Sequence, residues 1–232
     1  MKERILPTLL ETREKESELD AVSTDVPANA DGRWNAKDHL AHLAWWRDRD
    51  ATLIDAVRTG TTPPPAVEDD AQNAVIYEMY RDRPLGEIRE LARTSWDRVI
   101  EAAAACSEAD LAKPHPYSST EALWQTVCGV AFDHTGTHLT YWYLETGDLA
   151  KAEAAQRWWH DMHMKVAIDG RHRGFAAYNL ACFYARLGRA AEALPLLRQS
   201  FEWRPELREH ARHDTDLDRI RQDPGLASLL AT

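Results

Sequence analysis

The chain has 232 residues, of which 44% are hydrophobic and 28% are charged, enough apolar material for one large globular domain or two small ones. Its formal net charge of −10 argues against sequence-independent binding to nucleic-acid phosphates. No apolar run approaches the roughly 18 residues of a membrane span, and the charged N-terminus is not built like a signal peptide. We therefore expect no nucleic-acid partner, no membrane partner and a cytoplasmic location.

Apolar residues recur at helical spacing in four long segments of the first part of the chain. The segments are residues 3–22, 36–57, 85–106 and 119–147, and a shorter helix at 73–83 follows the proline-rich loop TGTTPPPAVEDD. Gly60 and Gly147 stand where two of the long patterns stop. This pattern predicts an all-α fold, with a four-helix bundle over residues 1–147.

The remaining residues, 148–232, carry a different helical pattern. Residues 174–205 resemble a tetratricopeptide repeat (TPR), because a set of small, aromatic and turn residues falls on its 34-residue spacing. These residues are Leu180, Ala181, Tyr184, Gly188, Ala193 and Pro205. We expect residues 148–232 to form a small helical TPR-like appendage.

Two histidines, His134 and His138, lie four residues apart in the segment AFDHTGTHLTYW. At about 100° per residue, both lie on the most apolar stripe of the helix at 119–147, which also carries Tyr141 and Glu145. Two neighbouring imidazoles on a core stripe are unfavourable unless something binds them, and neutral imidazoles one turn apart can chelate a metal ion. Thr135 stands where the HExxH motif has its glutamate, which excludes that type of zinc protease. The alternative is that both histidines hydrogen-bond to backbone or tyrosine partners inside the bundle.

The second long helix offers two candidates for a third ligand, His39 and His42. Helical projection alone favours His39, which lies near the middle of the apolar face, while His42 lies toward its edge. Asp38 projects further from that face, so we expect a solvated charge there.

The segments GRWNAKDHLAHLAWW and DHTGTH together resemble the DinB-like superfamily, and NAVIYEMYRDRPLGEIRELARTSWDRVI is similar to its ClbS/DfsB group. The resemblance implies a four-helix bundle in which His42, His134 and His138 bind one divalent metal ion, such as Zn, Ni, Fe or Mn. It also implies a metal-dependent hydrolase or a thiol-dependent transferase that uses a low-molecular-weight thiol. The substrate would be a small reactive, xenobiotic or natural-product molecule, as in ClbS-like detoxification or self-resistance.

Further site residues follow from their positions. Tyr141 and Glu145 are candidate catalytic residues, because their place on the histidine stripe would let them hydrogen-bond a ligand imidazole or a metal-bound water. Candidate walls of a substrate pocket are Trp34, Trp45, Trp46, Trp124 and Trp142. The competing hypothesis is a non-catalytic adaptor whose TPR-like segment binds a protein or peptide, with the bundle as a scaffold or sequestering pocket. The resemblance also leaves a homodimer open.

Overall fold

The computed structural model describes residues 1–26, 33–166 and 169–231, and the chain divides into two compact units, Met1–Trp142 and Tyr143–Thr232. Within the described ranges the regular structure is helical, and its one β-type pairing is an isolated bridge between Pro114 and Ala122. The all-α prediction is confirmed. The predicted separation into domains 1–147 and 148–232 stays a prediction.

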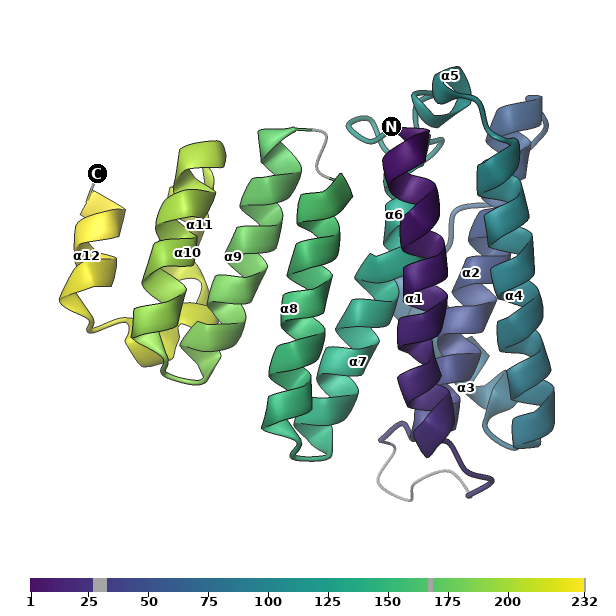
Figure 1. Cartoon of the computed structure of the whole chain (residues 1–232), viewed down its shortest axis with the longest axis horizontal. Coiled ribbons are helices and arrows are strands. Elements are labelled where there is room, and N and C mark those ends of the chain that lie inside the picture. Colours follow the sequence, from purple (N-terminus) through teal and green to yellow (C-terminus); the bar gives the residue numbers. More distant parts are fainter. Residues whose placement is uncertain (27–32, 167–168, 232) are drawn as a thin grey trace. The chain divides into compact units, whose positions relative to one another are not determined.

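The first unit is a bundle of four long helical segments (Figure 1). Its members are α1 (Lys2–Val22), α2 (Ala36–Thr59), α4 (Leu85–Ala105) and a composite fourth segment that runs from α6 (Leu123–Cys128) into α7 (His134–Glu145). Helix α3 (Asp69–Tyr80) packs on α2, and the short α5 (Glu108–Leu111) lies in the connection that follows α4. The predicted bundle helices are present, and the short helix begins at Asp69, four residues earlier than predicted.

Helix α2, which carries two of the histidines, has defined ends. The Asn35 side chain accepts a hydrogen bond from the backbone N–H of Asp38 (3.0 Å), and the Asp38 carboxylate accepts one from the backbone N–H of Asn35 (2.9 Å). At the other end Gly60 adopts φ = +73°, a left-handed conformation that glycine adopts without steric cost. The prediction of a solvated Asp38 is wrong: the residue is 5% exposed, because its carboxylate closes this capping box.

The fourth bundle segment is not the continuous α-helix that the sequence pattern predicted. Residues Gly129–Asp133 form one turn of π-helix between α6 and α7. Because a π-turn adds a residue to the helical repeat, the faces before and after it are out of the register that a uniform 100° per residue assumes. An apolar stripe drawn at a uniform 100° per residue through residues 119–147 therefore does not hold across this turn.

A buried polar network ties the four bundle segments together. Glu16 of α1 accepts hydrogen bonds from Arg47 of α2, from Nε1 of Trp96 in α4 (2.9 Å) and from the Thr135 hydroxyl in α7 (3.1 Å). The Arg47 guanidinium also lies over the Trp96 ring, with its Cζ 3.7 Å from the ring centroid. All four side chains are buried. Because a buried charge is costly unless it is paired, this network favours one alignment of the four segments.

The second unit is a succession of shorter helices. They are α8 (Leu149–Val166), α9 (Gly170–Arg186), α10 (Ala190–Trp203), α11 (Leu207–His213), a 3-10 turn (Thr215–Ile220) and α12 (Pro224–Ala231). Helices α9 and α10 pack as a helical hairpin, with Gly188 at φ = +72° in the turn between them. A helix–turn–helix is the unit that the TPR-like pattern predicted, and its relationship to that repeat stays a prediction.

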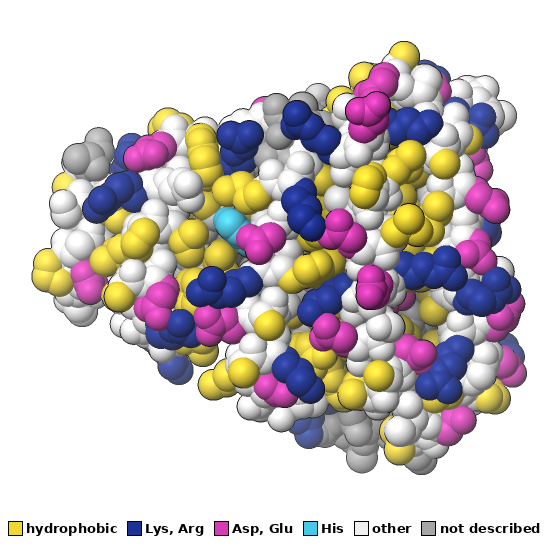
Figure 2. Space-filling model, viewed as in Figure 1, with side chains coloured by type: hydrophobic (Ala, Val, Ile, Leu, Met, Phe, Trp, Pro, Cys, Tyr) yellow, Lys and Arg dark blue, Asp and Glu magenta, His cyan; other side chains and the backbone are white. Residues whose placement is uncertain are grey.

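The surface is charged with both signs interspersed. Basic and acidic side chains alternate over the face in Figure 2, and many form ion pairs within one helix, such as Arg93 with Glu90 and Asp97. Exposed pairs of this kind add little to stability. None of the helices in the described part of the chain combines the length and the apolarity needed to cross a membrane.

Candidate metal centre

Three histidines from two distant parts of the sequence meet inside the first unit. His42 comes from α2, and His134 and His138 come from the first turn of α7 and the turn that follows. One ring nitrogen from each lies within 4.8 Å of the others, and no other group of three potential ligands in the described residues is so arranged. Nε2 of His42 is 2.8 Å from Nε2 of His134. These are the three residues that the family resemblance implied.

The capping box and the π-turn both contribute to this meeting. Asn35 and Asp38 fix where α2 begins, and His42 follows Asp38 by four residues, about one turn later. The π-turn ends at Asp133, directly before His134. Single π-turns inside α-helices often occur at functional sites, since they re-aim the side chains that follow.

A fourth imidazole, His39, adjoins the three. Its Nδ1 is 2.7 Å from Nδ1 of His138, so His39, which helical projection favoured, and His42, which the family resemblance implied, both lie in the cluster. His39 and His42 are 4% and 3% exposed, and His134 and His138 are partly buried. Nε2 of His39 and Nδ1 of His42 are buried without a hydrogen-bond partner among the described residues.

The cluster favours neutral imidazoles. Burial lowers the pKa of His39 to about 4, and burial together with the neighbouring His39 lowers the pKa of His42 to about 3. Burial and the other imidazoles also hold the pKa values of His134 and His138 well below the ordinary value. Since histidine binds metal ions in its neutral form, these side chains are ready to act as ligands at neutral pH.

The donor set fits a divalent transition metal. Imidazole nitrogens suit Zn, Cu, Fe and Ni, and one ring nitrogen from each of the three histidines lies within 4.8 Å of the other two. A site of three histidines also leaves coordination positions for water or substrate, as catalytic metal sites do.

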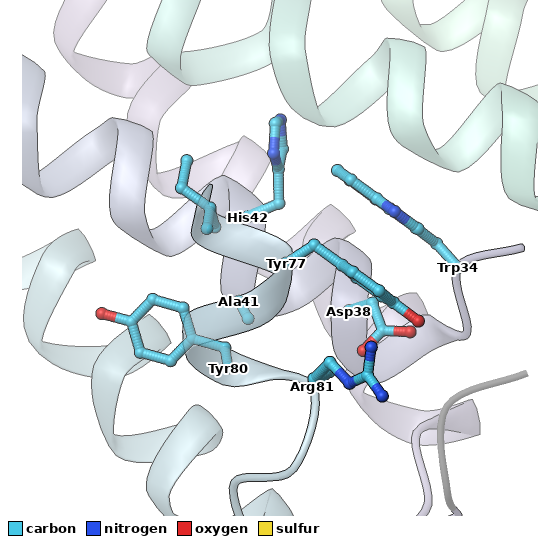
Figure 3. Close-up of a pocket in the computed structure, with 8 residues that line it drawn as sticks. Trp34, Asp38, Ala41, His42, Tyr77, Tyr80 and Arg81 are labelled. Carbon is cyan, nitrogen blue, oxygen red and sulfur yellow. The ribbon is translucent and has the colours of Figure 1, made fainter. Parts of the chain in front are cut away.

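A small pocket opens beside His42, between α2 and α3 (Figure 3). Its lining is mainly aromatic and apolar at one end and charged at the other. The residues are Trp34, Asp38, Ala41, His42, Ile76, Tyr77, Tyr80 and Arg81.

Trp34 joins this pocket to the histidines. Its ring centroid is 4.8 Å from that of His42 and 6.0 Å from that of His138. The Trp34 and Tyr77 rings are nearly parallel, 2° apart with centroids separated by 6.1 Å, and Figure 3 shows them facing each other. Trp34 therefore forms both a wall of the pocket and a cover of the histidine cluster.

Residues 73–77, NAVIY, begin the stretch that is similar to the ClbS/DfsB group, and they support this wall. The Asn73 side chain accepts a hydrogen bond from Nε1 of Trp46 (3.0 Å), and Ile76 is 1% exposed. Tyr77, the last residue of the segment, stacks on Trp34. The family similarity of this segment could have identified these pocket residues. Helical spacing could not, because it does not show that α3 packs on α2.

The other tryptophans predicted to wall the substrate site do not line this pocket. Trp142 is 6.0 Å from His39 between ring centroids, Trp124 is buried, and Trp45 packs edge-on against Trp46. Of the predicted tryptophans, Trp34 is the one that lines the pocket in Figure 3.

The two candidate catalytic residues on α7 are solvent-exposed. Tyr141 is 48% exposed and Glu145 is exposed, and within the described residues no hydrogen bond or ring contact joins either to the histidines. The buried face of α7 carries Thr135, Leu139, Thr140 and Tyr143 instead. The predicted apolar stripe on α7 is therefore wrong, and the roles assigned to Tyr141 and Glu145 stay predictions.

Comparison with known proteins gives one match. A family model described as the DinB superfamily matches residues 6–142, more than half of the chain, and this span contains all four clustered histidines. No curated protein and no solved structure matches the chain. The narrower ClbS/DfsB similarity and the TPR-like similarity stay predictions.

Proposed function

Because the chain belongs to the DinB superfamily, we propose that its first unit is a metal-dependent enzyme that acts on a small reactive, xenobiotic or natural-product molecule. The observation that carries the proposal is the convergence of His42, His134 and His138, whose nitrogens lie within 4.8 Å of one another beside an aromatic pocket. A shared fold does not decide a reaction, so the proposal rests on this site.

The three histidines would hold a divalent ion such as Zn, Ni, Fe or Mn. When bound, such an ion supplies Lewis-acid chemistry, which polarises a substrate and lowers the pKa of a coordinated water or thiol. The chain's own part is to present neutral nitrogens and to keep them away from bulk water. Burial of His42 and the Trp34 ring above it do both.

The pocket residues would bind the substrate. Trp34 and Tyr77, stacked on each other with centroids 6.1 Å apart, give the pocket an aromatic wall that suits an apolar molecule. At the charged end, Nη1 of Arg81 pairs with Glu78 (2.9 Å) and its Nε lies 3.7 Å from the Asp82 carboxylate, so the guanidinium would attract an oxygen-bearing group of the substrate. Aromatic walls with a few directed polar groups are typical of small-molecule sites.

Two reaction types fit this arrangement. In a hydrolysis of the ClbS type, a water oxygen bonds to a strained cyclopropane carbon, the carbon–carbon bond breaks, and the released electron pair takes a proton. In a thiol transfer, the sulfur of a low-molecular-weight thiol bonds to an electrophilic carbon, and the leaving group departs with its electron pair. In both reactions a neutral nucleophile must lose a proton near the bound substrate. A bound metal ion would favour that loss, because it lowers the pKa of a coordinated water or thiol.

The test is turnover by the metal-loaded protein. One assay offers 1-chloro-2,4-dinitrobenzene with glutathione, cysteine, bacillithiol or mycothiol and follows the aryl thioether by absorbance. The other offers an activated spirocyclopropane electrophile and follows ring opening by mass spectrometry in H2-18O. We expect one of these reactions to be faster than the uncatalysed rate, and His138→Ala to return it to that rate.

A matched control is His163→Ala, which removes a buried histidine of α8 that is not in the cluster. It should leave the rate unchanged. If loaded protein gives no rate above background in either assay, or if His138→Ala keeps the full rate, the proposed activity is wrong. The TPR-like adaptor would then become the better hypothesis.

A further inference from the structure

His39 is part of the histidine cluster without being one of the three grouped ligands. It lies one turn before His42 on α2, is 4% exposed, and makes an Nδ1-to-Nδ1 contact of 2.7 Å with His138. The two rings meet edge to face, with centroids 5.0 Å apart and planes at 68°. This is hydrogen-bond distance, and no other described residue bonds to either nitrogen.

The contact is a hydrogen bond only if one imidazole donates and the other accepts. If Nδ1 of His138 donates, the proton of the neutral ring is on Nδ1, and Nε2 is bare and able to bind an ion. If Nδ1 of His39 donates, His138 carries its proton on Nε2 and its other nitrogen is already engaged. Since a ligand nitrogen must be unprotonated, only the first arrangement is compatible with an ion held by His138.

We propose that His39 is a positioning residue: by accepting the Nδ1–H of His138 it fixes the tautomer and the orientation of that ligand. The inference rests on the proposed metal site. Ligand histidines usually donate their second N–H to a carboxylate, a carbonyl or a water, and here a neighbouring imidazole takes that place. Once His39 accepts at Nδ1, its own proton is on Nε2.

The lack of a partner at the second ring nitrogen of His39 supports this role. Nε2 of His39 is buried without a hydrogen-bond partner in the described residues. A histidine kept only for packing would be replaceable by leucine, which has no buried polar atom to leave unsatisfied. The cost of that orphan N–H is explained if the Nδ1 side of the same ring is needed to orient His138.

The experiment measures zinc affinity by chelator competition and records the cobalt(II) absorption spectrum for three proteins with the full chain. His39→Leu removes the acceptor and keeps an apolar side chain of similar bulk. His39→Asn places an amide oxygen three bonds from Cα, where Nδ1 of histidine lies. We expect His39→Leu to raise the zinc Kd about 10- to 100-fold, as loss of such outer partners does, and His39→Asn to recover most of the affinity. The cobalt band positions should be the same in all three.

Controls separate this role from packing and from direct ligation. His163→Leu, a buried histidine outside the cluster, should leave the Kd unchanged, and melting of the metal-free variants reports whether they fold. Should His39→Leu not fold, His39→Gln replaces it, because its amide oxygen lies one bond too far from Cα.

Three results would overturn the inference. One is an unchanged Kd in His39→Leu, another is a His39→Asn as weak as His39→Leu, and the third is a cobalt spectrum that has lost a nitrogen ligand, which would make His39 a ligand itself. Failure of the proposed function looks different, since the loaded wild-type protein would then give no turnover while the zinc affinities of the three proteins keep their expected order.

Discussion

Nε2 of His42 lies 2.8 Å from Nε2 of His134, although 92 positions separate the two residues in the chain. The contact depends on two features of the local backbone. A capping box sets the start of α2, and a π-turn ends directly before α7. The buried Glu16 network then joins the same two segments through Arg47 and Thr135. The histidines are therefore held by structure that exists without any ion.

Replacing Glu16 by glutamine should strongly destabilise the first unit. The substitution leaves the Arg47 cation buried without a counter-charge, and breaking a buried pair in this way costs about 3–5 kcal/mol. Urea unfolding followed by circular dichroism measures the change in the free energy of unfolding. Glu90→Gln is the matched control, because Glu90 pairs with Arg93 at an exposed position and its loss should change the stability far less than the loss of Glu16. Equal stability of the two variants would show that the network does not hold the bundle together.

Much of this architecture could be predicted from the sequence. The helix positions followed from apolar periodicity and from residues such as Gly60, which end helices for local steric reasons. The three grouped histidines followed from short motifs whose spacing matches a known family. Those motifs indicated His42 as the ligand on the second helix, whereas helical projection alone favoured His39.

The errors came from features that periodicity cannot show. A π-turn changes the helical repeat without an obvious residue signal, so a projection across Gly129–Asp133 gave the wrong register between α6 and α7. The exposure of Tyr141 could not be read from spacing, because it depends on which face of α7 the other helices cover. Asp38 was misjudged because a carboxylate in a capping box points back to the backbone of its own helix. The charge pairing of Glu16 with Arg47 depends on how α1 and α2 pack, and residues so far apart in sequence gave no local sign of it.

The metal-free protein should lose stability as the pH falls below about 6.5. The pKa values of His39 and His42 are about 4 and 3 in the folded protein, below the ordinary value of 6.5 that the unfolded chain has. Between these values the unfolded chain binds more protons than the folded chain, so protons favour unfolding. The stability is complete above about pH 6.5 and declines by up to about 1.4 kcal/mol per pH unit for each buried imidazole.

The measurement is the free energy of unfolding of the apoprotein at a series of pH values from 7.5 to 5. The double variant His39→Gln/His42→Gln should make this dependence shallower, whatever its absolute stability, and leave the part due to His134 and His138. His213→Gln, which changes a histidine with 82% side-chain exposure, should not. A wild-type stability that stays constant over this range would mean that the cluster is not buried in solution.

Trp34 should slow the exchange of a bound ion. Its ring covers His42 and His138, so Trp34→Ala would let a chelator approach the site more easily. We expect faster loss of zinc to a coloured chelator in stopped-flow measurements, with a smaller change in equilibrium affinity. Trp45→Ala is the control, because Trp45 packs on Trp46. If both variants release zinc at the wild-type rate, Trp34 does not cover the site.

The most direct test of the metal centre is the metal content of untagged protein after incubation with Zn, Ni, Fe or Mn and removal of excess ion. Mass spectrometry of the metal should give about one ion per wild-type chain for at least one of these metals. His42→Ala, His134→Ala and His138→Ala should each lower that content sharply while keeping the helical circular dichroism spectrum. A wild-type chain that stays empty with all four ions, or three variants that bind as the wild type does, would contradict the assignment of these histidines as metal ligands.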